Sequence, residues 1–445
     1  MRRAGRIAVA LAAAAAVAPA AAAVVPAATA STPAAATAVP AATASTPVAA
    51  TAAPAAAAGP PAAAAGGGGV SLGGCSWPFE ADPGVLNVAF PDTGARYWVA
   101  PFVAFGDGAP VRMRIRGRFP LARYLSFHLY ALTAPVDALA DVEIEPANGV
   151  NPFRPGARRA ERGSYELDVA LGPRPARPRP NTLYAALPGG GPLPAGLLVY
   201  RLYLPEGDDT GGAGLPELRL VVDGMERELA LPLSCPRLAG DSLLNPLLAE
   251  LGLPLGADAQ PATPAWEVGR SSDPLLGAGG LNLTGLLFPN LHNAYLRVRA
   301  PRTAGEVLAF RAKAPTFPGT RGAETMGSGE VRYWSVCSND FLTTRVLACL
   351  ADEDVAVDDD GWFTVVVSDR ARRPRTLRAT DNWLPAGPFP FFHVLYRHLL
   401  PDPAFAGAIQ RVADPRRPQD SMGDHHPDTR LCSRAAFEED RCGLP

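Results

Sequence analysis

One segment of the sequence places several side chains that could bind a ligand on a single face of a strand. The segment Arg123–Tyr130 reads RYLSFHLY, and successive side chains of a strand point to opposite faces. Its polar-tipped members would therefore share one face: Tyr124, Ser126, His128 and Tyr130. Aromatic rings and hydroxyls in such a row can line a pocket for a sugar or another flat ligand. The alternative is a solvated outer face, or tyrosines whose hydroxyls bond backbone groups.

A second row of this kind occurs later in the chain. The segment VRYWSV, which begins at Val331, aligns with ARYLSF, which begins at Ala122. As a strand it would place Tyr333 and Ser335 on one face, together with Cys337. The two halves of the chain are therefore expected to carry related polar faces.

Two arginines occupy matching points inside apolar segments. Arg201 and Arg397 each follow a tyrosine. An arginine that is buried in a strand needs a partner. The expected acids are Asp141 and Asp352, which lie in matching LAD segments. The sharper alternative is that each guanidinium clamps the carboxylate of a ligand.

Other groups of reactive residues give weaker evidence for a metal site or a catalytic site. Four histidines cluster late in the chain near acidic residues: His393, His398, His425 and His426. Neighbouring residues of an extended segment point apart, so no metal site is predicted. Ser126 and His128 could serve a hydrolase, but the only GxSxG string, GVSLG from Gly69, lacks the strand and helix of a nucleophile elbow. The sequence has no nucleotide-binding or zinc-protease motif, and no cofactor is predicted.

An internal repeat positions these residues. The segment Tyr97–Pro205 reappears in order as Asn293–Pro401. The matching strings are RGRFP with RAKAP, ARYLSF with VRYWSV, LAD with LAD, GSYELDV with GWFTVVV, NTLY with NWLP and VYRLYLP with LYRHLLP. Their constant order indicates a duplicated unit.

The repeated strings have the composition of strands. They are short, β-branched or aromatic, and bounded by Gly, Pro, Asn or Asp. VRMRIRG alternates apolar and charged residues, whereas GWFTVVVSD is more uniformly apolar and predicts a strand buried on both faces. Helical signals are few, and one begins at Asp402. The pattern predicts an all-β fold of two tandem related β-sandwich or jelly-roll-like domains with a few short helices.

The beginning of the chain indicates export. A basic start, an Ala-rich apolar run and small residues up to Ala23 have the layout of a signal peptide. The Ala-, Pro- and Thr-rich segment that follows lacks large apolar groups to bury, which predicts a disordered linker. An Ala-rich run that ends in proline is a poor membrane span, so no transmembrane segment is expected in the mature chain.

The cysteines fit an oxidising destination. Pairing neighbours in sequence gives the disulfides Cys75–Cys235, Cys337–Cys349 and Cys432–Cys442, although six cysteines leave fifteen pairings open. The predicted organisation is a signal peptide (1–23), a linker (24–74), a first β domain (75–235), a connector with short helices (236–292) and a second β domain with a C-terminal tail (293–445).

The second repeat resembles a known family. The strings RYWSVC, DGWFTVVVSD, NWLPAGPF and LYRHLLP are similar to the C-terminal module of an envelope-associated domain-of-unknown-function family. The whole chain resembles uncharacterised exported actinobacterial proteins. The resemblance implies a jelly-roll-like second module and an envelope location, and it carries over no catalytic residue. The first repeat departs from the family's NWLP pattern, because it has NTLY there.

The charge balance narrows the classes of function. The chain has 41 basic and 43 acidic residues, which disfavours a nucleic-acid binder and an electrostatic membrane anchor. The sequence therefore predicts a secreted, extracellular or cell-wall-associated protein that serves as a non-catalytic binding or structural module. Envelope polysaccharide or another small ligand is the expected partner. The alternative is a secreted hydrolase or other enzyme with its site between the two β domains.

Overall fold

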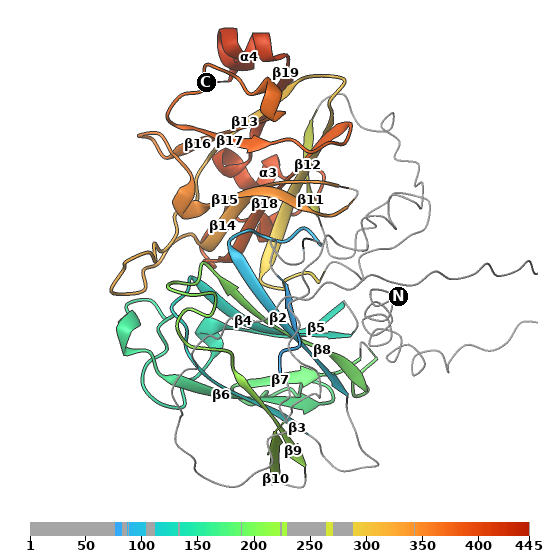
Figure 1. Cartoon of the computed structure of the whole chain (residues 1–445), viewed down its shortest axis with the longest axis vertical. Coiled ribbons are helices and arrows are strands. Elements are labelled where there is room, and N and C mark those ends of the chain that lie inside the picture. The colour runs from blue at the N-terminus through green and yellow to red at the C-terminus, as the bar shows by residue number, and fades with distance from the viewer. Residues whose placement is uncertain are drawn as a thin grey trace, which may run out of the picture. The chain divides into compact units, whose positions relative to one another are not determined.

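The computed structural model describes residues 76–81, 87, 89–103, 112–131, 134–187, 189–222, 225–228, 264–269, 288–341 and 343–444. Regular structure in these ranges is mostly β-strand (Figure 1). The predicted signal peptide and linker lie outside the described residues, as do Cys75 and Cys235. In the described part of the chain, no helix has the length and apolarity that crossing a bilayer requires.

The first sandwich is built from two five-stranded sheets. Its strands are β1 (Phe79–Ala81), β2 (Ala95–Val103), β3 (Arg112–Arg118), β4 (Tyr124–Ala131), β5 (Ala134–Ala140), β6 (Ser164–Leu171), β7 (Thr182–Ala185), β8 (Ala195–Tyr203), β9 (Glu217–Val222) and β10 (Met225–Glu228). The sheet orders are β1-β2-β8-β4-β5 and β10-β9-β3-β6-β7. Strands β6 and β7 run parallel, and the other paired strands are antiparallel.

The second sandwich has the same plan. Its strands are β11 (Ala265–Gly269), β12 (Asn293–Pro301), β13 (Val307–Lys313), β14 (Val331–Asn339), β15 (Val346–Ala351), β16 (Trp362–Ser368), β17 (Asp381–Pro385), β18 (Phe391–Pro401) and β19 (Asp428–Cys432). The sheet orders are β11-β12-β18-β14-β15 and β17-β16-β13-β19. Here β16 and β17 are the parallel pair.

Strand order and register confirm the predicted pair of related β-sandwiches. Replacing β1, β2, β8, β4 and β5 by β11, β12, β18, β14 and β15 converts one sheet order into the other. The register agrees as well, because Tyr97 pairs with Arg201 in the first sandwich and Tyr295 pairs with Arg397 in the second. Strand β11 lies in the segment predicted as a connector with short helices, and its buried Trp266 extends the second core.

Alternation along the strands fills each sandwich with one apolar core. In β4, Leu125, Phe127 and Leu129 face Ile115 and Leu167 of the other sheet. Strand β3 alternates between buried and partly exposed residues, as its sequence predicts. Strand β16 is buried from Phe363 to Ser368, which also agrees with the prediction. The second core is built in the same way around Trp334, Val336 and Phe310.

Helical structure is sparse, as predicted. The α-helices in the described residues are α3 (Gln419–Met422) and α4 (Arg434–Asp440), and 3-10 turns include η1 (Asp141–Glu143), η2 (Arg159–Glu161), η5 (Asp352–Asp354), η6 (Arg370–Arg372), η7 (Ile409–Arg411), η8 (Gly423–His425) and η9 (Arg441–Gly443). The helix expected from Asp402 is wrong. The carbonyl of Asp402 accepts the N–H of Phe405 and its carboxylate accepts the N–H of Ala404, which makes a turn instead.

Candidate functional site

The eight residues expected to bind a ligand are all buried. Each side chain lies on the outer face of a sheet, yet each residue is at most 2% exposed: Tyr124, Ser126, His128, Tyr130, Arg201, Tyr333, Ser335 and Arg397. The two rows approach each other at one end, where the Tyr203 ring contacts those of Tyr124 and Tyr333. Both sandwiches belong to one compact unit, Gly73–Pro445.

The cover over these faces comes from two short segments that lead into strands β2 and β12. We call Ala89–Gly94 the first arm and Phe288–His292 the second arm. The first arm lies between β1 and β2 of the first sandwich but contacts the second sandwich, and the second arm lies between β11 and β12 of the second sandwich but contacts the first. The two repeats therefore exchange arms.

The second arm lies across the polar row of β4. Arg201 Nη2 donates to the Phe288 carbonyl at 2.8 Å, and the Tyr130 hydroxyl donates to the Pro289 carbonyl at 2.8 Å. The Leu291 N–H donates to His128 Nε2 at 3.1 Å. At the end of the arm, the Tyr124 hydroxyl is 2.6 Å from His292 Nδ1. Four of the eight predicted binding residues are thus bonded to the second arm: Tyr124, His128, Tyr130 and Arg201.

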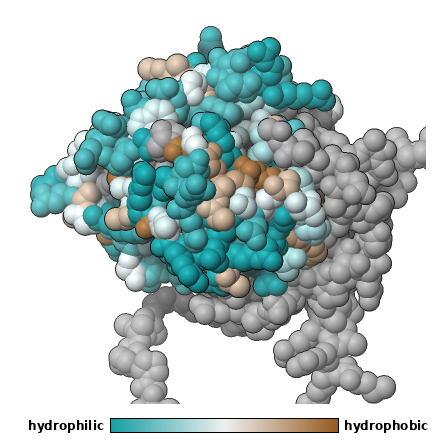
Figure 2. Space-filling model, turned by 90° about the horizontal axis from the view of Figure 1, so that it is seen from above, coloured by the Kyte–Doolittle hydropathy of each residue, from teal (hydrophilic) through white to brown (hydrophobic). Residues whose placement is uncertain are grey.

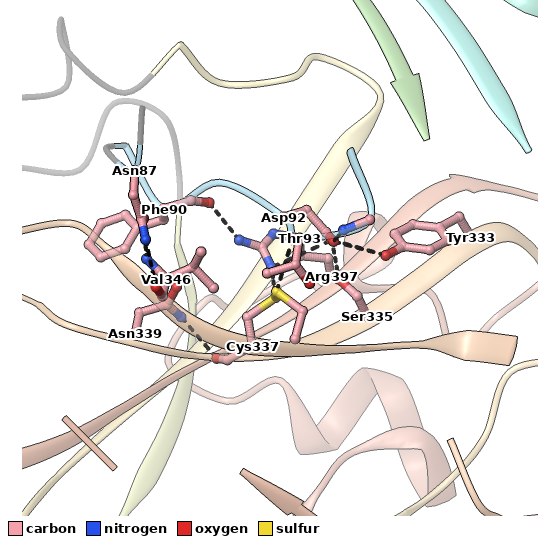
Figure 3. Close-up of a disulfide and its surroundings, with 12 residues drawn as sticks. Asn87, Phe90, Asp92, Thr93, Tyr333, Ser335, Cys337, Asn339, Val346 and Arg397 are labelled. Atoms are coloured by element: carbon pink, nitrogen blue, oxygen red, sulfur yellow. Dashed lines mark hydrogen bonds and ion pairs between the residues drawn. A yellow bond between two sulfur atoms is a disulfide. The ribbon is translucent and has the colours of Figure 1, made fainter. Parts of the chain in front are cut away.

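The first arm lies across the matching row of β14, as Figure 3 shows. Arg397 Nη2 donates to the Phe90 carbonyl at 2.7 Å. The Asp92 carboxylate accepts hydrogen bonds from the Ser335 hydroxyl at 2.6 Å and from the Tyr333 hydroxyl at 3.1 Å. Its Oδ2 lies 3.8 Å from Arg397 Nη1, so a buried ion pair completes the contact.

The arms carry a sequence signal that the repeat analysis did not use. FPDTGARY, from Phe90, and FPNLHNAY, from Phe288, begin just upstream of the recognised repeats and run into them. Both phenylalanines have a positive φ, 52° and 43°. The two equivalent arginines bind the carbonyls of these two residues. The signal was weak because only Phe-Pro and the final Tyr recur at matching positions.

The ion pairs expected for Arg201 and Arg397 are wrong. Asp141 pairs with Arg332 at 3.2 Å, and Asp352 pairs with Arg123 at 2.9 Å. Each acid thus bonds an arginine of the other sandwich, since Arg123 and Arg332 precede Tyr124 and Tyr333 in the matched strings. Burial raises the pKa of Asp141 to about 6 and that of Asp352 to about 7, although the paired guanidinium opposes the shift in each case.

The Ser126–His128 pair is arranged against catalysis. Ser126 Oγ lies 3.2 Å from His128 Nδ1. His128 Nε2 accepts the Leu291 N–H, so a neutral ring carries its proton on Nδ1 and donates it to the serine. Burial holds the pKa of His128 well below its ordinary value, which keeps the ring neutral. A general base for Ser126 would need an unprotonated nitrogen facing the hydroxyl.

The late histidines do not converge on a metal. His398 is in the core and its Nδ1 accepts the Ile409 N–H at 3.3 Å, whereas His425 Nδ1 lies 2.9 Å from the Lys313 carbonyl. One group of potential ligand atoms does occur within 4.8 Å in the described residues, from Asp92, Cys337 and Cys349. Both sulfurs are bonded to each other in a disulfide, so neither is a thiolate that could bind a metal.

Two of the three predicted disulfides fall within the described residues and form as predicted. Cys337 and Cys349 sit opposite each other on β14 and β15, and Cys432 joins β19 to Cys442. The predicted pair of Cys75 and Cys235 lies outside the described residues.

Open pockets occur away from the buried rows. One of about 740 Å³ lies on the second sandwich, lined by side chains that include Lys313, Ser328, Phe405 and Asp424. Another of about 520 Å³ lies where the sandwiches meet, lined by residues that include Gly94, Arg96, Arg321 and Cys349. None of the eight predicted binding residues lines either pocket.

Comparison with known proteins gives distant similarity. No protein-family model and no curated protein matches the chain. Among solved structures, an uncharacterised protein from Burkholderia cenocepacia is 17% identical, with 82% of this chain and 84% of that chain covered and a TM-score of 0.46. A protein from Vibrio parahaemolyticus is 12% identical, with 76% and 89% covered and a TM-score of 0.36. The chain is similar to these two bacterial proteins at a level from which no activity follows.

Proposed function

We propose that this chain is an exported, non-catalytic binding or structural protein of the cell envelope or the extracellular space. The observation that carries the proposal is the closure of both polar strand faces by the exchanged arms. The hydroxyl, imidazole and guanidinium groups that could take part in catalysis form hydrogen bonds inside the molecule. A catalytic site needs such groups free beside a space that admits substrate.

Two further observations support export. The chain begins with the basic, apolar and small-residue layout of a signal peptide. The described residues contain two disulfides, Cys337–Cys349 and Cys432–Cys442, which persist in oxidising compartments and are rare in the cytosol.

We place the ligand in the 740 Å³ pocket of the second sandwich. Its lining offers hydroxyls, carboxylates, an ammonium group and an aromatic ring, from Ser328, Asp424, Lys313 and Phe405 among others. The Asp424 carboxylate has no hydrogen-bond or ion-pair partner among the described residues, so it is free to accept hydrogen bonds. The surface seen in Figure 2 is mostly hydrophilic, with hydrophobic residues in small separate areas. A ligand rich in hydroxyl groups, such as an envelope polysaccharide, fits this chemistry.

The test is a pull-down of the mature protein on immobilised envelope polysaccharide. We expect retention of the wild type and roughly ten- to hundredfold weaker binding of Asp424→Ala, because a hydrogen bond to a charged group contributes about 1.5–3 kcal/mol. The matched control is Asp359→Ala, which removes another exposed carboxylate, in the turn before β16. Its binding should equal that of the wild type.

Two outcomes would overturn the proposal. Failure of the wild type to bind any envelope polysaccharide would remove the ligand class. Hydrolysis of a polysaccharide or ester substrate by the purified protein would remove the non-catalytic function, and Ser126→Ala would show whether the buried serine is responsible.

A further inference from the structure

The two sulfurs of the Cys337–Cys349 disulfide have different surroundings. Cys337 is fully buried, and its Sγ accepts Nη1 of the buried Arg397 at 2.6 Å. Cys349 is partly exposed and lines the 520 Å³ pocket, where its Sγ accepts the Thr93 N–H at 3.5 Å. One sulfur therefore faces an open space and the other faces a positive charge.

The position of Cys349 makes its sulfur reachable without opening the core. Strand β15 is the edge strand of its sheet, and Cys349 pairs with Cys337 directly across from β14. The pocket that Cys349 lines also contains two ion pairs, Arg96 with Asp209 and Arg321 with Asp354. Asp208 also lines the pocket, so three carboxylates face two guanidinium groups there, and the two ion pairs leave one net negative charge against which a small polar thiol must enter.

We propose that this disulfide is a site of thiol–disulfide exchange, attacked at Cys349 by a small thiol from the pocket. The incoming thiolate forms a bond to Cys349 Sγ and breaks the bond to Cys337, which leaves as a thiolate. Arg397 stabilises that leaving thiolate, and a better-stabilised leaving thiolate departs faster. A second thiol then attacks the mixed disulfide and releases the oxidised small-molecule disulfide and the Cys349 thiolate. The two thiols are oxidised, and the protein disulfide is reduced by two electrons.

Thiol–disulfide exchange at Cys349 would change the contact between Arg397 of the second repeat and the first arm. Asp92 lies 3.8 Å from Arg397, so the guanidinium already shares its charge with the first arm. A thiolate on Cys337 would compete with Asp92 for the same cation. Opening the disulfide therefore loosens the first arm and leaves the second arm, which contacts no cysteine in the described part of the chain, as it was. This inference stands independently of the proposed polysaccharide ligand.

The second disulfide provides an internal control. Cys432 and Cys442 pack against the apolar cluster of Val307, Val366 and Phe437. Among the described residues, no arginine donates a hydrogen bond to either of these sulfurs. Cys432 and Cys442 are partly exposed, as Cys349 is, but neither leaving thiolate would accept a hydrogen bond from a guanidinium. We therefore expect the bond between them to open more slowly than the bond between Cys337 and Cys349.

The experiment uses the native full-length mature protein and glutathione as the probe. After timed incubation, free thiols are alkylated with N-ethylmaleimide and peptides are mapped by mass spectrometry. We expect glutathione on Cys349, the alkyl label on Cys337 and an intact Cys432–Cys442 bond. Glutathione on Cys337, or opening of both disulfides at the rate of global unfolding measured by circular dichroism, would overturn the proposal.

A pair of variants tests the role of the guanidinium. Arg397→Gln should slow the opening about tenfold, because the leaving thiolate loses its cation. The matched control is Arg201→Gln, which removes the equivalent contact between an arginine and an arm from the other repeat. Equal slowing in both variants would contradict a role for Arg397. If Arg397→Gln does not fold, the position of the glutathione on the wild type still decides the proposal.

Discussion

The two arm sites have the same architecture and different chemistry. In both, a strand arginine binds the carbonyl of an arm phenylalanine, Arg201 with Phe288 and Arg397 with Phe90. Around this common contact, the residues at matching positions differ: His128 against Cys337, Ala138 against Cys349, and Asn290 against Asp92. The comparison teaches that the two repeats share the backbone contact and differ in the side chains beneath the arm.

This divergence makes the two sites sensitive to different conditions. The site on the first sandwich, beneath the second arm, contains His128 and His292, whose rings lie 5.0 Å apart, so protonation of these rings would destabilise it. The site on the second sandwich, beneath the first arm, contains an ion pair and a disulfide, so reduction of the disulfide would destabilise it. Between the sites, the Arg123–Asp352 and Arg332–Asp141 pairs are reciprocal and belong to both repeats.

The largest expected effect tests the reciprocal pairs. Arg123 is fully buried, whereas the Arg332 side chain is 9% exposed. Breaking a buried pair leaves an uncompensated charge and costs about 3–5 kcal/mol. We expect Arg123→Met to lower the unfolding free energy by that amount in urea denaturation, and Arg332→Met to lower it by less. The control, Arg158→Met, removes an exposed ion pair and should cost less than about 1 kcal/mol. Equal costs for all three would refute a structural role for the reciprocal pairs.

The next largest effect tests the pH sensitivity of the site on the first sandwich, beneath the second arm. Burial, helped by Arg201, lowers the pKa of His292 to about 4, below the value of about 6.5 expected in the unfolded chain. Its contribution to stability is therefore present above about pH 6.5 and lost as the pH falls toward 4. We expect the unfolding free energy to drop by about 2 kcal/mol less in His292→Asn than in the wild type between pH 7 and pH 4.5.

Two buried acids act with the opposite sign in the same range. The pKa values of Asp141 and Asp352 are raised, to about 6 and about 7, so each acid destabilises the fold as the pH rises from the pKa of about 3.9 expected in the unfolded chain toward its raised pKa. Because both acids remain in His292→Asn, subtracting the two urea titrations isolates the histidine. An unchanged pH dependence in the variant would contradict the assignment to His292.

The smallest expected effect concerns an asparagine that both repeats contain at the matching position. Asn181 and Asn382 each tie a loop to a strand, since each amide bonds both backbone groups of one loop residue and a strand carbonyl. Asn181 differs in having a φ of 51°, a region that alanine disfavours by roughly 1–2 kcal/mol. We expect Asn181→Ala to be about 1 kcal/mol more destabilising than Asn382→Ala in urea denaturation. Glycine at position 181 should remove the difference, and a persistent difference would exclude backbone strain as its cause.

Much of the fold could be predicted because its signals are local. The alternation in β3 and the uniform apolar run in β16 predicted their burial, and the spacing of Tyr124, Ser126, His128 and Tyr130 predicted their common face. What covers that face could not be predicted. The contact between Arg397 and Phe90 joins residues 307 positions apart, and no local pattern specifies such a pairing. The expected partners of Arg201 and Arg397 were wrong for the same reason.

The sequence by itself determined which side of each strand a residue occupies, because that depends on a few adjacent positions. Only the tertiary structure decided that the two polar rows would be sealed by exchanged arms, and that Asp141 and Asp352 would each bond an arginine of the opposite repeat. Burial of a sheet's outer face depends on how whole sandwiches dock. Duplicated segments offer each side chain two chemically equivalent partners, and only packing selects between them.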